Sequence, residues 1–148
     1  MKIKPALLIF ALLLLVSLPL KAAETVRIKA FDTMKYDLSK ITAKPGQKMT
    51  VELTNEGTLP KATMGHNWIL LKAGSDAGSY SAAAMKAKAQ DYQPPALANE
   101  VLASIGMLGP KESGKTSFTA PSTPGSYPFL CSFPGHYQSG MKGVLIVK

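Results

Sequence analysis

The chain has 148 residues, with 17 Lys and Arg against 9 Asp and Glu, which gives a formal net charge of +8 at pH 7. The basic residues are scattered and form no stripe interleaved with aromatic side chains, so the charge does not indicate a nucleic-acid-binding protein. A mildly basic surface can still attract an acidic partner.

The N-terminal segment predicts a secretory signal peptide in residues 1–22. Lys2 and Lys4 precede an apolar run, and Ala22 supplies a small residue before the expected cleavage bond. The run is about 15 residues long, shorter than the roughly 20 of a spanning helix, which disfavours an uncleaved anchor. The short two-lysine start is typical of bacterial signals, so we expect a periplasmic protein with one domain in residues 23–148.

Strands dominate the remaining chain. Residues 25–30 and 48–55 alternate apolar and polar side chains, which is the pattern of a half-buried strand. Glycine and proline turns separate further short strand candidates, which are residues 34–37, 40–42, 67–71, 115–119, 126–130 and 143–147. This arrangement predicts an antiparallel β-sandwich or barrel.

One segment interrupts the strands. Residues 79–90 are rich in alanine and other good helix formers, and Pro94 and Pro95 follow them. Ser79 or Ser81 can cap the N-terminus of such a helix through its hydroxyl. The segment therefore predicts one short helix inserted between strands.

The most informative stretch lies near the C-terminus, where Cys131, His136 and Met141 fall within eleven residues. Thiolate, imidazole and a weak axial thioether form the donor set of an electron-transfer copper site. His66 is the only other histidine, so it is the candidate for the remaining donor. The sequence predicts that these four residues bind one copper ion.

Neighbouring residues suit the same role. Pro134 and Gly135 lie where the loop must turn sharply. Gly65 permits a close backbone approach, so its carbonyl is a candidate contact to the metal. Asn67 can form hydrogen bonds between the two segments that carry the ligands.

Other interpretations compete with copper. The single Cys131 can be a buried inert thiol or the site of an intermolecular disulfide. Zinc is disfavoured because structural zinc sites use four strong ligands, and only three are present. A Cys-His hydrolase needs an orienting residue and an oxyanion hole, which nothing in the sequence marks. A metal-free binding domain with an incidental motif is the remaining alternative.

Two stretches of the sequence resemble the cupredoxins, which are the type 1 blue copper proteins. They are residues 59–70, and residues 131–136 followed by residues 141–143. The similarity is greatest to the azurins and extends over residues 24–148. The four residues between His136 and Met141 match the loop spacing of the auracyanins instead. The resemblance implies an all-β, eight-stranded Greek-key β-sandwich with one short inserted helix.

The resemblance also implies roles for individual residues. His66, Cys131 and His136 would be equatorial ligands, Met141 an axial ligand and the Gly65 carbonyl a distant contact. Redox partners would dock near an exposed edge of His136, on an apolar patch formed by Met34, Leu59, Met64, Phe133 and Pro134.

These features predict a monomeric, non-enzymatic protein that carries single electrons on one copper ion cycling between Cu(I) and Cu(II). A periplasmic copper carrier or scavenger, which could use the same ligands, is the main alternative. A subunit of a larger copper enzyme is a second one, but both histidines are used in the first site, so none remains for a second metal.

Overall fold

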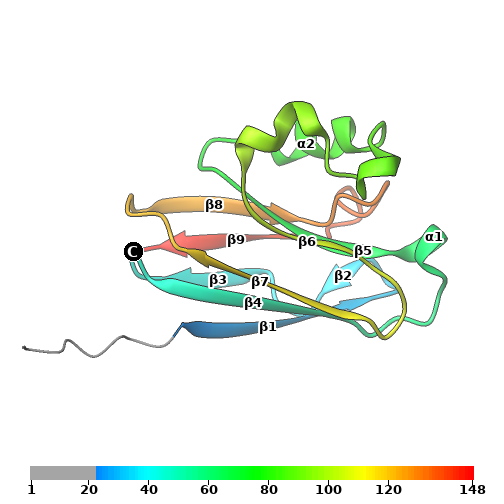
Figure 1. The fold of residues 1–148 in the computed structure, drawn as a ribbon, viewed down its shortest axis with the longest axis horizontal. Helices are drawn as coiled ribbons and strands as arrows, with labels where there is room; N and C mark the ends of the chain where they lie inside the picture. Colours follow the sequence, from blue (N-terminus) through cyan, green and yellow to red (C-terminus); the bar gives the residue numbers. More distant parts are fainter. Residues whose placement is uncertain (1–22) are drawn as a thin grey trace, which may run out of the picture.

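The computed structural model describes residues 23–148, which form two packed β-sheets with a short helical segment on one side (Figure 1). The predicted signal peptide lies outside the described residues. Within residues 23–148, no helix combines the length and hydrophobicity needed to cross a membrane.

The first sheet has the strand order β2-β1-β4-β7 and the second has the order β3-β9-β8-β5-β6. The β1–β4 and β3–β9 pairs are parallel, and the remaining pairs are antiparallel. The strands are β1 (Glu24–Phe31), β2 (Lys35–Tyr36), β3 (Lys40–Ala43), β4 (Lys48–Asn55), β5 (His66–Leu71), β6 (Val101–Leu108), β7 (Ser113–Thr119), β8 (Gly125–Leu130) and β9 (Lys142–Val147). The predicted eight-stranded sandwich is confirmed, with the two-residue β2 as a ninth strand.

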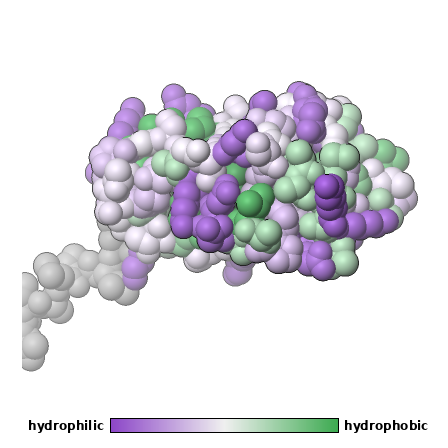
Figure 2. All heavy atoms as spheres, turned by 90° about the horizontal axis from the view of Figure 1, so that it is seen from above, coloured by the Kyte–Doolittle hydropathy of each residue, from purple (hydrophilic) through white to green (hydrophobic). Residues whose placement is uncertain are grey.

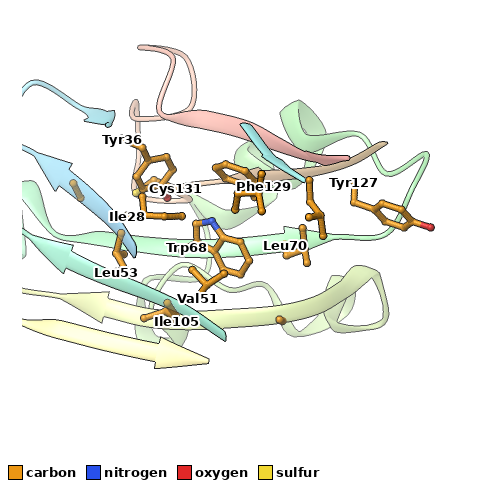
Figure 3. Packing of buried hydrophobic residues seen from close by; sticks show 14 of the residues in the cluster. Ile28, Tyr36, Val51, Leu53, Trp68, Leu70, Ile105, Tyr127, Phe129 and Cys131 are labelled. Atoms are coloured by element: carbon orange, nitrogen blue, oxygen red, sulfur yellow. The ribbon is translucent and has the colours of Figure 1, made fainter. Parts of the chain in front are cut away.

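The core lies between the two sheets and includes the single cysteine. Trp68 and Phe129 come from the second sheet and pack against the buried side chains of the first sheet. The centroids of the Trp68 and Phe129 rings are 5.6 Å apart. Cys131 lies at one end of this cluster, close to Tyr36, and both are buried (Figure 3). The thiol therefore belongs to the hydrophobic core.

The helical segment covers the outer side of β5. Strand β5 is buried along its whole length because Ile69 and Leu71 face Tyr80 of helix α2 (Ala77–Ala84), while Trp68 and Leu70 face the core. Burial on both faces explains why this strand reads as an apolar run without alternation. Seen from the helix-bearing side, hydrophobic atoms gather toward the end of the molecule that carries helix α1 (Lys61–Met64), with hydrophilic side chains among them (Figure 2).

The predicted helix at residues 79–90 is present but has different ends. Helix α2 begins earlier, and the 3-10 helices η1 (Lys88–Gln90) and η2 (Pro95–Glu100) follow it. The expected cap at Ser79 or Ser81 is wrong, because the Asp76 carboxylate accepts hydrogen bonds from the backbone N–H groups of Gly78 and Ser79. A carboxylate cap satisfies the free donors of the first turn.

Candidate metal centre

The predicted ligands come from two antiparallel neighbours in the second sheet. Ile69 of β5 pairs with Leu130 of β8, so the beginning of β5 lies beside the end of β8. His66 is the first residue of β5, and Cys131 directly follows β8. Two residues that are far apart in the sequence therefore meet at one end of the sandwich, where α1 and the connection from β8 to β9 also lie (Figure 1).

The structure brings His66, Cys131 and His136 together, with their possible ligand atoms all within 4.8 Å of one another. The two Nδ1 atoms are 3.2 Å apart, and Cys131 Sγ lies 3.4 Å from His136 Nδ1. Metal–nitrogen bonds of about 2.0 Å place two nitrogens on one ion roughly 3–3.5 Å apart. The two measured separations are compatible with binding of one small metal ion by the three side chains.

The connection between β8 and β9 is folded by its own backbone. Cys131 N donates to Met141 O at 3.0 Å, and Met141 N donates to His136 O at 2.9 Å. Gly135 and Gly140 have φ angles of +84° and +95°, which favour glycine. The predicted turn at Gly135 is confirmed, and the loop holds Met141 fully buried beside the other three residues.

Gly65 is required for steric reasons. A Cβ at this position would lie 2.7 Å from Lys61 O and 2.9 Å from Met107 Sδ. Its φ angle of −67° is open to any residue, so the close packing, and not the backbone conformation, demands glycine. The backbone of Gly65 is therefore packed closely against α1 and Met107, directly before His66 in the chain.

Asn67 joins the two ligand-bearing segments, as the sequence predicted. Its Oδ1 accepts from Ser132 N at 2.8 Å, and its Nδ2 donates to Ser132 Oγ at 2.8 Å and to Asp91 O at 3.1 Å. The Tyr36 hydroxyl donates to Asn67 O from the first sheet. Sequence reasoning missed Tyr36 and Asp91, since no motif marks a residue that acts through a long-range contact.

Burial keeps the three groups neutral. It lowers the pKa of His136 to about 4, and the neighbouring His66 acts in the same direction. Burial also lowers the pKa of His66, against the opposing effects of Asp32 and the Phe31 carbonyl. Among residues 23–148, no group forms a hydrogen bond of normal geometry with His66 Nε2. Burial raises the pKa of the Cys131 thiol to about 11, partly offset by the N–H groups of Asn67 and Phe133.

One expectation about this site is wrong. The edge of His136 was expected to be exposed, but only 1% of this residue is accessible to solvent. The Phe133 ring lies against the imidazole, with the two centroids 4.6 Å apart. Phe133 is itself buried, with only 8% of its surface exposed, so it is not an accessible member of the predicted apolar patch.

The sandwich fold and the buried Cys-His-His cluster define a cupredoxin. Residues 22–148 match the family described as copper binding proteins of the plastocyanin/azurin family, and the chain belongs to this family. Copper is the cofactor, and the donor set of soft sulfur and imidazole suits it.

Individual relatives agree with this assignment. The chain is 37% identical to azurin from Pseudomonas chlororaphis over 126 residues, covering 83% of this chain and 97% of that azurin. It is 34% identical to auracyanin-B from Chloroflexus aurantiacus, covering 84% of this chain but only 52% of that protein. Among solved structures, reduced auracyanin from Roseiflexus castenholzii superposes with a TM-score of 0.76 at 36% identity, covering 86% of this chain and 99% of that one.

Proposed function

We propose that this protein is an exported carrier of single electrons. His66, Cys131 and His136 would be the equatorial ligands of one copper ion, Met141 the axial ligand and the Gly65 carbonyl a distant contact. The observation that carries the proposal is the cluster of three buried ligand atoms, with Cys131 Sγ 3.4 Å and His66 Nδ1 3.2 Å from His136 Nδ1. When bound, copper would supply the Cu(I)/Cu(II) couple.

The chain's own contribution would be a rigid, dry frame for that couple. Cys131, His66 and Met141 are fully buried, and hydrogen bonds of Asn67 and Ser132 hold the surrounding backbone. A fixed set of donors limits the rearrangement that accompanies a change of oxidation state. This property supports electron transfer, in which the same ligands must serve both states, and it implies no enzymatic step.

The same proposal covers export and docking. Residues 1–22 would be removed as a signal peptide, leaving the cupredoxin domain, residues 23–148, as a monomer in the periplasm. Partners would dock on the apolar patch, in which Leu59 is 44% exposed and Met34, Met64 and Pro134 are half-buried. Small, weak contacts of this kind suit transient redox encounters.

A visible absorption titration of the protein with Cu(II), beside a Cys131→Ser variant, tests the metal site. An intense thiolate-to-copper band that saturates at one copper per chain and disappears in the variant would support the proposal. A colourless product would overturn it. Repeated reduction and oxidation in the presence of a copper chelator then separates the alternatives, because an electron carrier retains its copper and a copper carrier or scavenger releases it.

Electron self-exchange between the reduced and oxidised protein tests the patch without a known partner. Met64→Lys places a charge in the patch, so it should slow self-exchange while the absorption band stays unchanged. Thr119→Lys is the matched control, because it adds the same charge on β7 where this strand pairs with the beginning of β4. An unchanged rate in Met64→Lys would remove the patch from the proposal.

A further inference from the structure

A small pocket opens beside Phe133, whose ring packs against His136. Its volume is about 160 Å³, and the residues that line it include Lys61, Lys88, Asp91, Tyr92, Met107 and Phe133. We call it the Tyr92 pocket. Lys61 belongs to α1 and Lys88 to η1, so two elements that are separate in the sequence contribute to its lining.

The aromatic residues of the Tyr92 pocket lead directly to the metal centre. The Tyr92 and Phe133 rings are tilted against each other with centroids 5.2 Å apart, and Phe133 lies 4.6 Å from the His136 ring. Because Phe133 is both a wall of the pocket and a neighbour of His136, anything bound in the pocket lies one ring away from a ligand of the metal.

The wall formed by Tyr92 is fixed in place. Asp91 and Tyr92 are consecutive residues with φ angles of +53° and +58°, a conformation that is uncommon outside glycine. Buried side chains hold both carbonyls, since Asn67 Nδ2 donates to Asp91 O at 3.1 Å and Ser132 Oγ donates to Tyr92 O at 2.7 Å. The pocket is therefore a preformed feature that shares its supports with the metal centre.

Charge distinguishes this pocket from the apolar patch. Lys61 and Lys88 are exposed, and within residues 23–148 neither ammonium has a carboxylate within salt-bridge distance. Asp91 contributes an opposing negative charge, so the lining carries a net positive charge above an apolar floor of Met107 and Phe133. A carboxylate on an apolar stem complements such a lining.

Size limits the occupant further. Sites for drug-sized molecules measure about 300–1,000 Å³, so a volume near 160 Å³ accommodates one protruding side chain rather than an organic ligand. We propose that the Tyr92 pocket anchors an acidic side chain of a redox protein partner, which presents carboxylates around its own electron-transfer edge. This inference rests on the proposed electron-carrier function and adds to it the charge and the entry point of the partner.

The binding test uses the copper(I) protein and hexacyanochromate(III), a redox-inert paramagnetic trianion that broadens nearby amide NMR signals. Signals of residues 61, 62, 91 and 92 should broaden first. This effect should disappear in a Lys61→Glu/Lys88→Glu variant and persist in the matched control Lys44→Glu/Lys48→Glu, whose charges lie around the beginning of β4. Broadening that centres on other lysines, or that survives in the Lys61→Glu/Lys88→Glu variant, would overturn the proposal.

The kinetic test measures oxidation of the same proteins by hexacyanoferrate(III), which takes one electron from the reduced protein and becomes hexacyanoferrate(II). Reversing two charges near a trianion should slow the reaction about tenfold at low ionic strength, and high salt should remove the difference. The control variant should react at nearly the original rate, and equal slowing in both variants would count against a localised site.

The two proposals fail in different ways. Absence of the thiolate-to-copper band would refute the electron-carrier function, whereas a normal band with no preference of the trianion for the pocket would refute only the docking inference. A normal thiolate-to-copper band in the Lys61→Glu/Lys88→Glu variant would also show that the metal centre of this variant is intact.

Discussion

Replacing Asn67 with alanine tests the idea that one side chain holds the two ligand-bearing segments together. The substitution removes three hydrogen bonds, of which two connect Asn67 to Ser132 and one connects it to the Asp91 carbonyl. Asn67 is fully buried, so water cannot readily take over these contacts. Ser132 N would lose its partner in the interior, and Asp91 O would lose a partner in a partly buried position.

The magnitude follows from these lost contacts. Each buried group without a hydrogen-bond partner costs about 1–3 kcal/mol, so Asn67→Ala should lower the free energy of unfolding by about 3 kcal/mol or more. This is a large part of the roughly 5–15 kcal/mol of a typical domain. Affinity for copper should fall by about 10–100-fold, as for other residues that orient metal ligands. Urea unfolding of the metal-free protein and competition with a copper chelator measure the two effects.

Tyr127→Phe provides the control because Tyr127 is buried near the beginning of β8, whereas Cys131 follows the end of that strand. The Tyr127 hydroxyl donates to Thr123 O at 2.7 Å, and the substitution removes only this hydrogen bond. This variant should also lose stability, yet keep its absorption band and its copper affinity. The reasoning would be refuted if Asn67→Ala lost less than about 1 kcal/mol, or if both variants changed copper affinity equally.

Three further predictions concern the ligand loop and its surroundings. Met141→Leu keeps a buried apolar side chain at this position, so the thiolate-to-copper absorption band should persist. The reduction potential should shift, because the proposed weak axial ligand tunes that potential, and voltammetry measures the shift. Gly143→Ala would drive a Cβ into the Ser39 carbonyl and the Phe129 ring, so urea unfolding should show a loss of about 2 kcal/mol or more. The melting temperature of the metal-free protein should fall as the pH is lowered from 6.5 to about 4, because the pKa of His136 is lowered in the folded state and the unfolded chain binds the proton more readily. Thermal melts at several pH values measure this, and a melting temperature that does not change over the range would contradict it.

Much of the architecture could be predicted because it is encoded locally. Strand β4 was expected at residues 48–55 and has those bounds, since its alternation matches burial of Met49, Val51 and Leu53 in the core. The loop from Cys131 to Met141 could also be recognised from the sequence, because three predicted ligands of one site lie on a single connection between adjacent strands. His66 followed as the only other histidine in the chain.

Strand β6 was not anticipated, although Ala103, Ile105 and Met107 alternate toward the core. The positions between them include an apolar leucine and a glycine, which weaken the contrast on which a period of two depends. Helix α1 was also missed, since four residues are too few to show a helical period. Both elements depend on pairing and packing with distant parts of the chain, which a single sequence does not display.

Burial of the metal centre connects its chemistry to its surface. The same packing that raises the pKa of the Cys131 thiol and lowers that of His136 favours neutral groups, so copper must displace the thiol proton when it binds. That packing also removes both His136 and the adjacent Phe133 ring from solvent. If the protein carries electrons as proposed, an electron that enters or leaves near His136 would cross the packed layer of Phe133 and its neighbours. The contacts that a partner makes with this layer, rather than with the imidazole itself, should control the rate of exchange.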